Sequence, residues 1–150
     1  MPAARPALGF TLVELVMVMV LVATLAVTAL PRIANTSDWA LRAFSDDLAA
    51  QLMGARRMAL SQRRPIVATI TGSGVSLAYA GGGALGSLAC PASATPCIAE
   101  GGSRTVTFNV GNTGATSTST GAPLTLTISG NGYSRVLQVA HETGHVLLPP

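Results

Sequence analysis

Hydrophobic and polar positions follow three successive patterns along the chain, and each pattern predicts a different kind of element. Residues 10–30 form an apolar run that contains a single charged residue. A helix of this length extends about 30 Å, the hydrocarbon thickness of a bilayer, so the run predicts a membrane-spanning helix. The run ends without the small-residue cleavage pattern of a secretory signal, which argues against the alternative of a signal peptide.

The second pattern begins after Pro31 and has the period of an amphipathic helix over about residues 37–63. Most charged residues of this segment lie away from the apolar positions on the helical wheel. Ser37 or Asp38 is placed to cap the start of the helix, and Pro65 closes it. The apolar positions are Leu41, Phe44, Leu48, Leu52, Ala55 and Ala59. We expect this apolar stripe to pack on a sheet.

The third pattern begins at residue 66, where the period changes to two and glycine-rich segments separate short runs. Residues 72–74 and 130–132 predict hairpin turns, and the second includes an Asn-Gly step suited to positive φ. The stretches at 81–87 and 111–123 predict loops. The expected strands cover residues 66–71, 75–80, 104–110, 124–129 and 133–139. Together the patterns predict an α+β fold, a long N-terminal helix packed on an antiparallel β-sheet.

Composition agrees with an apolar part that does not face water. Only 10% of the 150 residues are charged, which is low for a soluble domain of this size. All nine basic residues are arginine, and the formal net charge of +3 does not form the polybasic tract that follows a phosphate backbone. Charge alone therefore gives no support for nucleic-acid binding.

Two cysteines lie in one short loop. Cys90 and Cys97 bound the segment CPASATPC, whose length and turn residues bring the two Cα atoms within reach of a disulfide. A reduced structural pair is the alternative, whereas a structural zinc site would need two more ligands nearby. We predict a Cys90–Cys97 disulfide and therefore an oxidising compartment.

The single charge within the apolar run, Glu14, is the most informative residue of the first segment. An ionised carboxylate inside a bilayer costs about 2.5 to 3.5 kcal/mol, so it needs either a hydrated position near the interface or a cationic partner. Residues 9–16 spell GFTLVELV, and Arg5 precedes them. This segment resembles the cleavage and methylation motif of type IV prepilins and type II secretion pseudopilins.

The resemblance implies a maturation pathway and a role for the carboxylate. Residues 1–9 match the leader that a membrane prepilin peptidase removes, with the cut between Gly9 and Phe10, and the new N-terminus is then methylated. The carboxylate of Glu14 matches the one that meets the terminal amine of a neighbouring subunit in the filament. Pro31 matches a helix-kinking proline, in agreement with the loss of a backbone donor there.

The end of the second segment carries a further resemblance. Residues 55–67, ARRMALSQRRPIV, resemble the helix-to-strand junction of minor pilins of the FimT/GspH type, and of MSHA-type minor pilins in particular. This implies a structural subunit of an MSHA-like type IV pilus without enzymatic activity or cofactor; a type II secretion minor pseudopilin is the alternative. It also implies an inner-membrane protein with residues 31–150 in the periplasm. The implied partners are other pilins, the prepilin peptidase and the inner-membrane assembly platform.

Four arginines form a candidate contact surface. Arg56 and Arg63, like Arg57 and Arg64, are seven residues apart, so a continuous helix would project them from one side as a basic patch. We expect this patch to be solvated or to contact acidic groups of filament neighbours. The alternative is DNA binding for uptake, which predicts a steep salt dependence.

One motif suggests a different chemistry. His141, Glu142 and His145 spell HETGH, which satisfies the H-E-x-x-H pattern of zinc metalloproteases. That mechanism needs a helix and a third protein ligand, yet Gly144 interrupts the motif and the preceding residues alternate as in a strand. We therefore predict a turn between two terminal strands.

Overall fold

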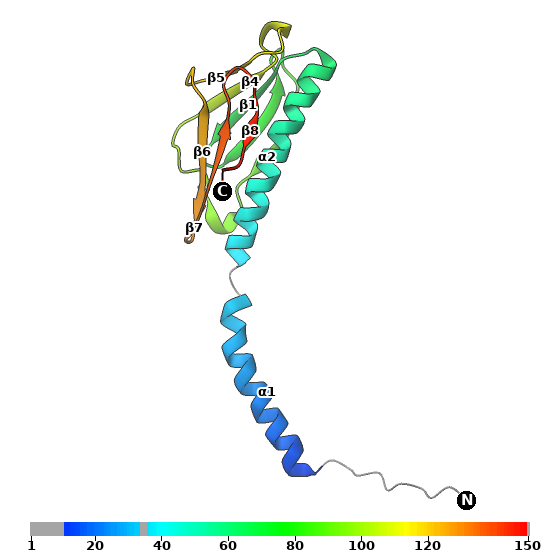
Figure 1. The fold of residues 1–150 in the computed structure, drawn as a ribbon, viewed down its shortest axis with the longest axis vertical. Helices are drawn as coiled ribbons and strands as arrows, with labels where there is room; N and C mark the ends of the chain where they lie inside the picture. Colours follow the sequence, from blue (N-terminus) through cyan, green and yellow to red (C-terminus); the bar gives the residue numbers. More distant parts are fainter. Residues whose placement is uncertain (1–10, 34–35, 150) are drawn as a thin grey trace, which may run out of the picture. The chain divides into compact units, whose positions relative to one another are not determined.

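The structure, a computed structural model, describes residues 11–33 and 36–149, and gives the backbone alone for residues 27–33 and 36. The chain divides into two compact units, with the boundary between residues 36 and 37. The first unit contains helix α1 (Leu12–Ile33), and the second contains the body of helix α2 (Thr36–Gln62) and two antiparallel sheets (Figure 1). Each unit is described separately below.

Helix α1 begins directly after Thr11, whose hydroxyl accepts a hydrogen bond from the backbone N–H of Glu14 at 3.3 Å. It ends at Ile33, two residues beyond Pro31. Within residues 11–33 and 36–149, no helix combines the length and the apolar character needed to cross a membrane. Gly9, Phe10 and the expected leader lie outside the described residues, as does the side chain of Pro31, so the kink there stays a prediction.

Helix α2 buries the stripe that the sequence predicts, because all six expected positions are buried. Ser45 and Ala49 lie on the same side of the helix and are buried with them. The helix ends at Gln62, where Arg63 takes a left-handed conformation with φ 52°. The backbone N–H of Arg64 then donates to the carbonyl of Ala59 at 3.2 Å, which satisfies one free carbonyl of the last turn.

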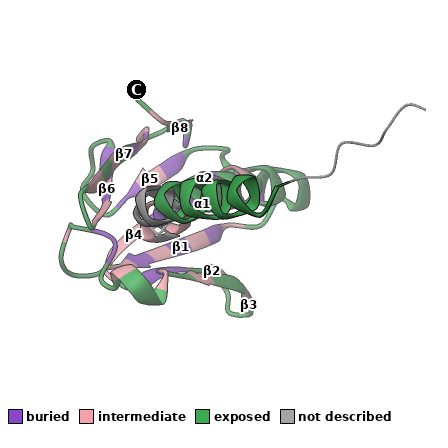
Figure 2. Ribbon diagram, turned by 90° about the horizontal axis from the view of Figure 1, so that it is seen from below, coloured by how far each residue is buried: buried purple, intermediate pink, exposed green. Residues whose placement is uncertain are grey.

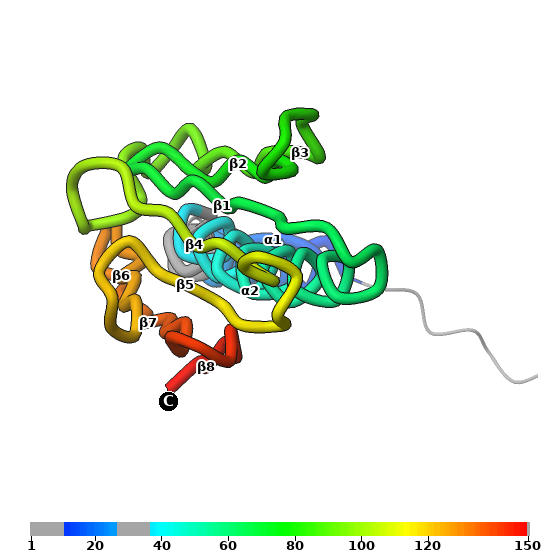
Figure 3. Tube along the Cα trace, turned by 90° about the horizontal axis from the view of Figure 1, so that it is seen from above, coloured from blue at the N-terminus to red at the C-terminus, as the bar shows by residue number. Residues whose placement is uncertain are grey.

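Two antiparallel sheets form a curved wall beside α2 (Figures 2 and 3). The first sheet has the strand order β3-β2-β1-β4-β5, and the second has the order β6-β7-β8. Buried residues lie on the faces of both sheets that meet α2 (Figure 2). The strands are β1 (Ile66–Thr71), β2 (Gly74–Tyr79), β3 (Ala84–Ala89), β4 (Arg104–Phe108), β5 (Thr116–Thr118), β6 (Leu124–Gly130), β7 (Tyr133–Val139) and β8 (Val146–Leu147). The predicted α+β fold with an antiparallel sheet is confirmed.

The five expected strands correspond to β1, β2, β4, β6 and β7. Both hairpin turns are confirmed as well, and Asn131 and Gly132 have the positive φ values, 50° and 90°, that the Asn-Gly step predicts. The two expected loops are wrong in part. Strand β3 lies mostly within residues 81–87, and β5 lies within residues 111–123. Neither strand could be recognised from an apolar–polar alternation in the sequence. Most of β3 is exposed on both faces, and β5 consists of the polar residues Thr-Ser-Thr, although its burial alternates.

Asn109 connects the end of α2 to the first sheet. It is buried and left-handed, with φ 60°. Its side-chain N–H donates to the carbonyl of Ala59 at 3.0 Å, and its side-chain oxygen accepts from the N–H of Gly114 at 2.9 Å. One side chain therefore satisfies a helix carbonyl and fixes the loop after β4.

The disulfide predicted from the sequence is present, with 5.7 Å between the Cα atoms of Cys90 and Cys97. Cys90 follows the end of β3, and its N–H donates to the carbonyl of Ser73 at 2.8 Å. The carbonyl of Cys97 accepts the N–H of Ser129 in β6, also at 2.8 Å. The bridge therefore links the outer part of the first sheet to the second sheet.

Candidate functional site

Helix α1 is the largest exposed apolar surface among the described residues. Over residues 12–25, its large apolar side chains are exposed on every side of the helix, from 79% for Leu12 to 49% for Val16. A helix that is apolar all round is stable only when lipid or other apolar helices surround it. The exposed residues are Leu12, Val13, Leu15, Val16, Met17, Val18, Met19, Val20, Leu21, Val22 and Leu25. This helix is the candidate functional surface.

Glu14 lies in the first turn of this helix, with its side chain exposed. Its backbone N–H bonds to the hydroxyl of Thr11, and the T-x-x-E spacing is that of a capping box. A carboxylate in the first turn also interacts favourably with the positive end of the helix dipole. Sequence reasoning missed this capping role, although the spacing was visible. Within the described residues, Glu14 forms no ion pair.

The four arginines do not share one side of a helix, so that part of the expectation is wrong. Helix α2 ends before Arg63, and the left-handed backbone there turns the following residue away from the helical path. The guanidinium of Arg64 lies 4.0 Å from the centre of the Tyr79 ring, in a cation–π contact. Arg56 and Arg57 instead line a hollow beside the turn before β8. Arg64 therefore lies apart from Arg56 and Arg57.

The HETGH segment forms the predicted turn between β7 and β8. Glu142 and Gly144 have positive φ values of 71° and 65°, so the two histidines do not lie one helical turn apart. The Nδ1 atom of His141 accepts the N–H of Thr118 at 3.3 Å and lies 3.0 Å from its hydroxyl. Within the described part of the chain, no three His, Cys, Asp or Glu side chains are grouped to hold a metal ion. The segment therefore joins β5 to the second sheet and lacks the geometry of a zinc protease.

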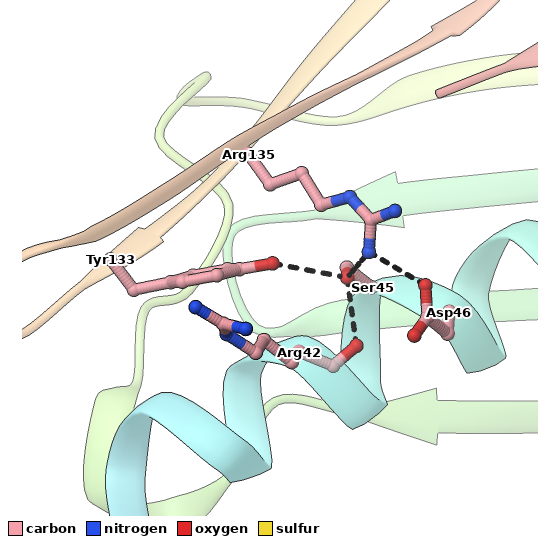
Figure 4. Close-up of polar contacts among 5 residues, drawn as sticks. All are labelled: Arg42, Ser45, Asp46, Tyr133 and Arg135. Carbon is pink, nitrogen blue, oxygen red and sulfur yellow. Dashed lines mark hydrogen bonds and ion pairs between the residues drawn. The ribbon is translucent and has the colours of Figure 1, made fainter. Parts of the chain in front are cut away.

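A polar cluster between α2 and β7 was not predicted from the sequence (Figure 4). Ser45 is fully buried, and its hydroxyl donates to the carbonyl of Arg42 at 2.8 Å. The guanidinium of Arg135 donates to the Ser45 hydroxyl at 3.1 Å and to the Asp46 carboxylate at 2.6 Å. The Tyr133 hydroxyl lies 3.4 Å from the same serine oxygen. These contacts fix the β6–β7 hairpin to the first half of α2.

Charge reinforces this cluster. Partial burial lowers the pKa of the Arg135 guanidinium, and its contacts with Asp46 and Tyr133 raise it, with a net pKa above the ordinary value. The side chain therefore stays charged at every physiological pH. The guanidinium of Arg42 lies 5.7 Å from the Tyr133 ring centre and 6.0 Å from that of the exposed Trp39. No pattern of neighbouring residues could predict the cluster, because Tyr133 and Arg135 lie about 90 positions after Ser45 in the sequence.

Comparison with known proteins gives the fold a precedent. No family model and no curated protein sequence matches the chain. The chain is similar to the crystal structure, in space group P21, of the type IV minor pilin FimU from Pseudomonas aeruginosa strain PAO1. The two are 25% identical with a TM-score of 0.52, over 73% of this chain and 88% of that chain. A second FimU crystal form, in space group P65, shares the fold, with 23% identity and a TM-score of 0.50 over 73% of this chain and 92% of that one.

The similarity agrees with what the residues show independently. The similarity to FimU in space group P21 extends over most of the chain, and both molecules have the α+β fold predicted from the sequence. The disulfide and the prepilin-like first segment are features of this chain itself. The chain is a type IV minor pilin-like protein.

Proposed function

We propose that this protein is a structural subunit of an MSHA-like type IV pilus, packed into the filament through residues 10–30. The observation that carries the proposal is the exposure of apolar side chains on all sides of α1 over residues 12–25. Burial of apolar surface stabilises by about 25 cal/mol per Å², so a helix of this kind gains most when neighbouring helices cover it. The alternative assembly is a type II secretion pseudopilus.

Before assembly, the same residues are proposed to hold the protein in the inner membrane, with residues 31–150 in the periplasm. The run at residues 10–30 has the length of a bilayer-spanning helix, and the disulfide between Cys90 and Cys97 is typical of an oxidising compartment. The assembly platform of the inner membrane is the proposed partner at this stage. It would receive the subunit and pass it to the growing filament.

Maturation is proposed to create the positive charge that Glu14 requires. Cleavage by the prepilin peptidase between Gly9 and Phe10 would leave Phe10 at the N-terminus, and methylation would retain its positive charge. In a filament, the Glu14 carboxylate of one subunit would then bind the terminal amine of its neighbour. Both groups are costly to bury alone, so correct axial register is favoured by their pairing.

The exposed arginines are proposed to make secondary contacts in the filament. Arg57 and Arg63 are exposed, and neither guanidinium forms an ion pair within the described residues. Asp47 is exposed on the first half of α2 and offers a complementary charge on a neighbouring subunit. Such rim contacts contribute little affinity and mainly influence orientation.

Mass spectrometry of the protein extracted from membranes of its native host tests the proposal. We expect a chain that begins at Phe10, carries one added methyl group and contains the Cys90–Cys97 bridge. Purified filaments should contain the same species. A mature chain that begins after Leu30 would show that the apolar run is discarded, and the proposal would then be wrong.

A further inference from the structure

The outer edges of the two sheets are protected to different extents. The edge of β6 is covered because the Glu100 carboxylate accepts the N–H of Thr127 at 2.8 and 2.9 Å. The edge of β5 is covered because Thr116 and Glu142 exchange two backbone hydrogen bonds, both of 2.8 Å. Strand β8 is only two residues long. These are the usual ways in which a protein prevents unwanted strand pairing.

Strand β3 has none of these protections. It is six residues long and ends the row of strands in Figure 3, and no described strand pairs with its outer edge. The N–H of Cys90 points inward, toward the β1–β2 hairpin, where it bonds to the carbonyl of Ser73 just before β2. Because the direction of hydrogen bonding alternates along a strand, the backbone groups of Ser87 and Ala89 point outward. Residues 65–99 contain no charged side chain, so no charge protects this edge.

A hollow adjoins this edge on the face that meets α2. The register places Leu77 of β2 opposite Gly86 of β3, which has no side chain. Gly54 lies in α2, and a Cβ atom added to either glycine would meet nothing within 4 Å. With Met58 and Leu85, these residues line a space of about 300 Å³. The row of side chains across β1, β2 and β3 therefore ends in a space that can hold an apolar side chain.

Gly54 makes this space unusual. A glycine inside a helix destabilises it by about 1 kcal/mol relative to alanine, and Gly54 lies well within α2. Nothing in the subunit itself occupies the room that the missing side chain leaves. Met58, one helical turn further on, is 38% exposed although it is large and apolar. Both observations agree with a surface that a second molecule covers.

We propose that β3 pairs antiparallel with β3 of a second copy of this chain, with Ser87 directly opposite Ser87 of the partner subunit. In this register, Leu88 of each copy lies opposite Gly86 of the other. Leu88 pairs with the buried Val75, so its side chain is on the face that contains the hollow. Leu88 of each copy thus fills the space beside Gly86 of the other copy. The contact therefore occurs twice, as the symmetry of a two-fold interface requires.

This pairing also satisfies the free backbone groups of the edge. The outward N–H and C=O groups of Ser87 bond to the same groups of the partner's Ser87, and the uncharged segment brings no like charges together. The result is one continuous sheet across two subunits. The interface lies wholly in the second unit, so it does not depend on the packing of α1.

A designed cross-link tests the register. Full-length protein with Ser87→Cys, purified in detergent and mildly oxidised, should form a covalent dimer, because opposite Cα atoms lie about 5.5 Å apart. Ser76→Cys is the matched control. Ser76 pairs with Ser87 on the same face but is one strand further in, so its two copies would be about 14 Å apart. Absence of the dimer with Ser87→Cys, or equal yields from both variants, would overturn the proposal.

Charge exchange at the same position gives an independent test. Ser87→Lys and Ser87→Glu each place like charges opposite one another, which should weaken self-association about 2- to 5-fold. An equimolar mixture of the two variants should restore it. Sedimentation equilibrium in density-matched detergent measures both effects, with Ser76→Lys as the control. A mixture that associates no better than either variant alone would contradict the proposed pairing.

Discussion

The two long helices of this protein treat apolar surface in opposite ways. Helix α2 has a buried apolar stripe that the two sheets of the same chain cover, and three other large apolar residues, Trp39, Met58 and Leu60, are exposed outside that stripe. Helix α1 has apolar residues on all sides over residues 12–25, and these side chains are exposed. The difference shows that the angular spread of apolar residues around a helix indicates whether the helix packs within its own subunit or against other molecules. A narrow stripe is matched within the subunit, whereas a full apolar surface needs other molecules.

The largest effect is expected from the one carboxylate on the exposed helix. Glu14→Gln should remove the charge that we propose pairs with a neighbour's terminal amine, and loss of one partner of a buried pair costs about 3 to 5 kcal/mol. We expect the variant to accumulate in the membrane and to be nearly absent from sheared filaments, measured by immunoblot.

Thr11→Ala is the matched control for Glu14→Gln. It removes the hydroxyl that accepts the Glu14 N–H but keeps the carboxylate, and loss of such a cap costs about 1 kcal/mol. The control should therefore still enter filaments. Equal losses for the two variants would indicate that helix capping, and not the charge, is what filament entry requires.

The next effect distinguishes the covered stripe from the exposed helix directly. Leu52→Ala in α2 should lower the free energy of unfolding of the second unit by about 2 to 5 kcal/mol, because Leu52 is fully buried. Leu21→Ala in α1 removes the same atoms from an exposed position and should leave that free energy unchanged. Denaturant titration followed by circular dichroism at β-sheet wavelengths measures both. A comparable shift for Leu21→Ala would mean that α1 stabilises the second unit.

A smaller effect is expected where α2 ends. Asn109→Ala removes the donor to the Ala59 carbonyl and strains a left-handed position, so we expect a loss of about 1 to 3 kcal/mol in unfolding free energy. Asn109→Gly removes the same side-chain bonds but tolerates the backbone conformation, and it should lose less. The difference between the two variants in thermal or chemical denaturation measures the backbone contribution. Equal losses would show that the hydrogen bonds alone matter.

The smallest effect is expected from the ion pair between Arg135 of β7 and Asp46 of α2. Arg135 and Asp46 are about one third and two thirds exposed, so solvent screens their attraction. A double-mutant cycle with Arg135→Met and Asp46→Asn should give a coupling free energy of about 0.2 to 1 kcal/mol. The coupling should decrease in 1 M salt. A coupling that salt leaves unchanged would indicate that the hydrogen bond to Ser45 dominates instead.

The sequence predicted those elements whose apolar residues recur with the period of a helix or of a strand. The six stripe positions of α2 and the five alternating strands satisfy that condition, and they are where the structure places them. Strand β3 could not be predicted because small residues and exposure on both faces remove its alternation. The end of α2 was misjudged by one residue, and the left-handed Arg63 was enough to break up the expected arginine patch.

The candidate site divides in the same way. The exposed apolar helix and Glu14 were evident from hydropathy and one motif, because both are local features of the chain. The cluster around Ser45 was not evident from the sequence. A serine on the apolar stripe of α2 is explained only by its contacts with Arg135 and Tyr133, which lie on β7. Long-range polar contacts of this kind depend on the packed fold and leave no periodic trace in the sequence.

The cysteine bridge also affects what proteolysis of this protein would produce. Residues 91–96 form a largely exposed loop between the two bonded sulfurs, so they are open to enzymatic attack. A single cut there would leave both fragments covalently joined, with the sheets on either side still held together. The nicked subunit would migrate as one chain until a reducing agent separated it into two.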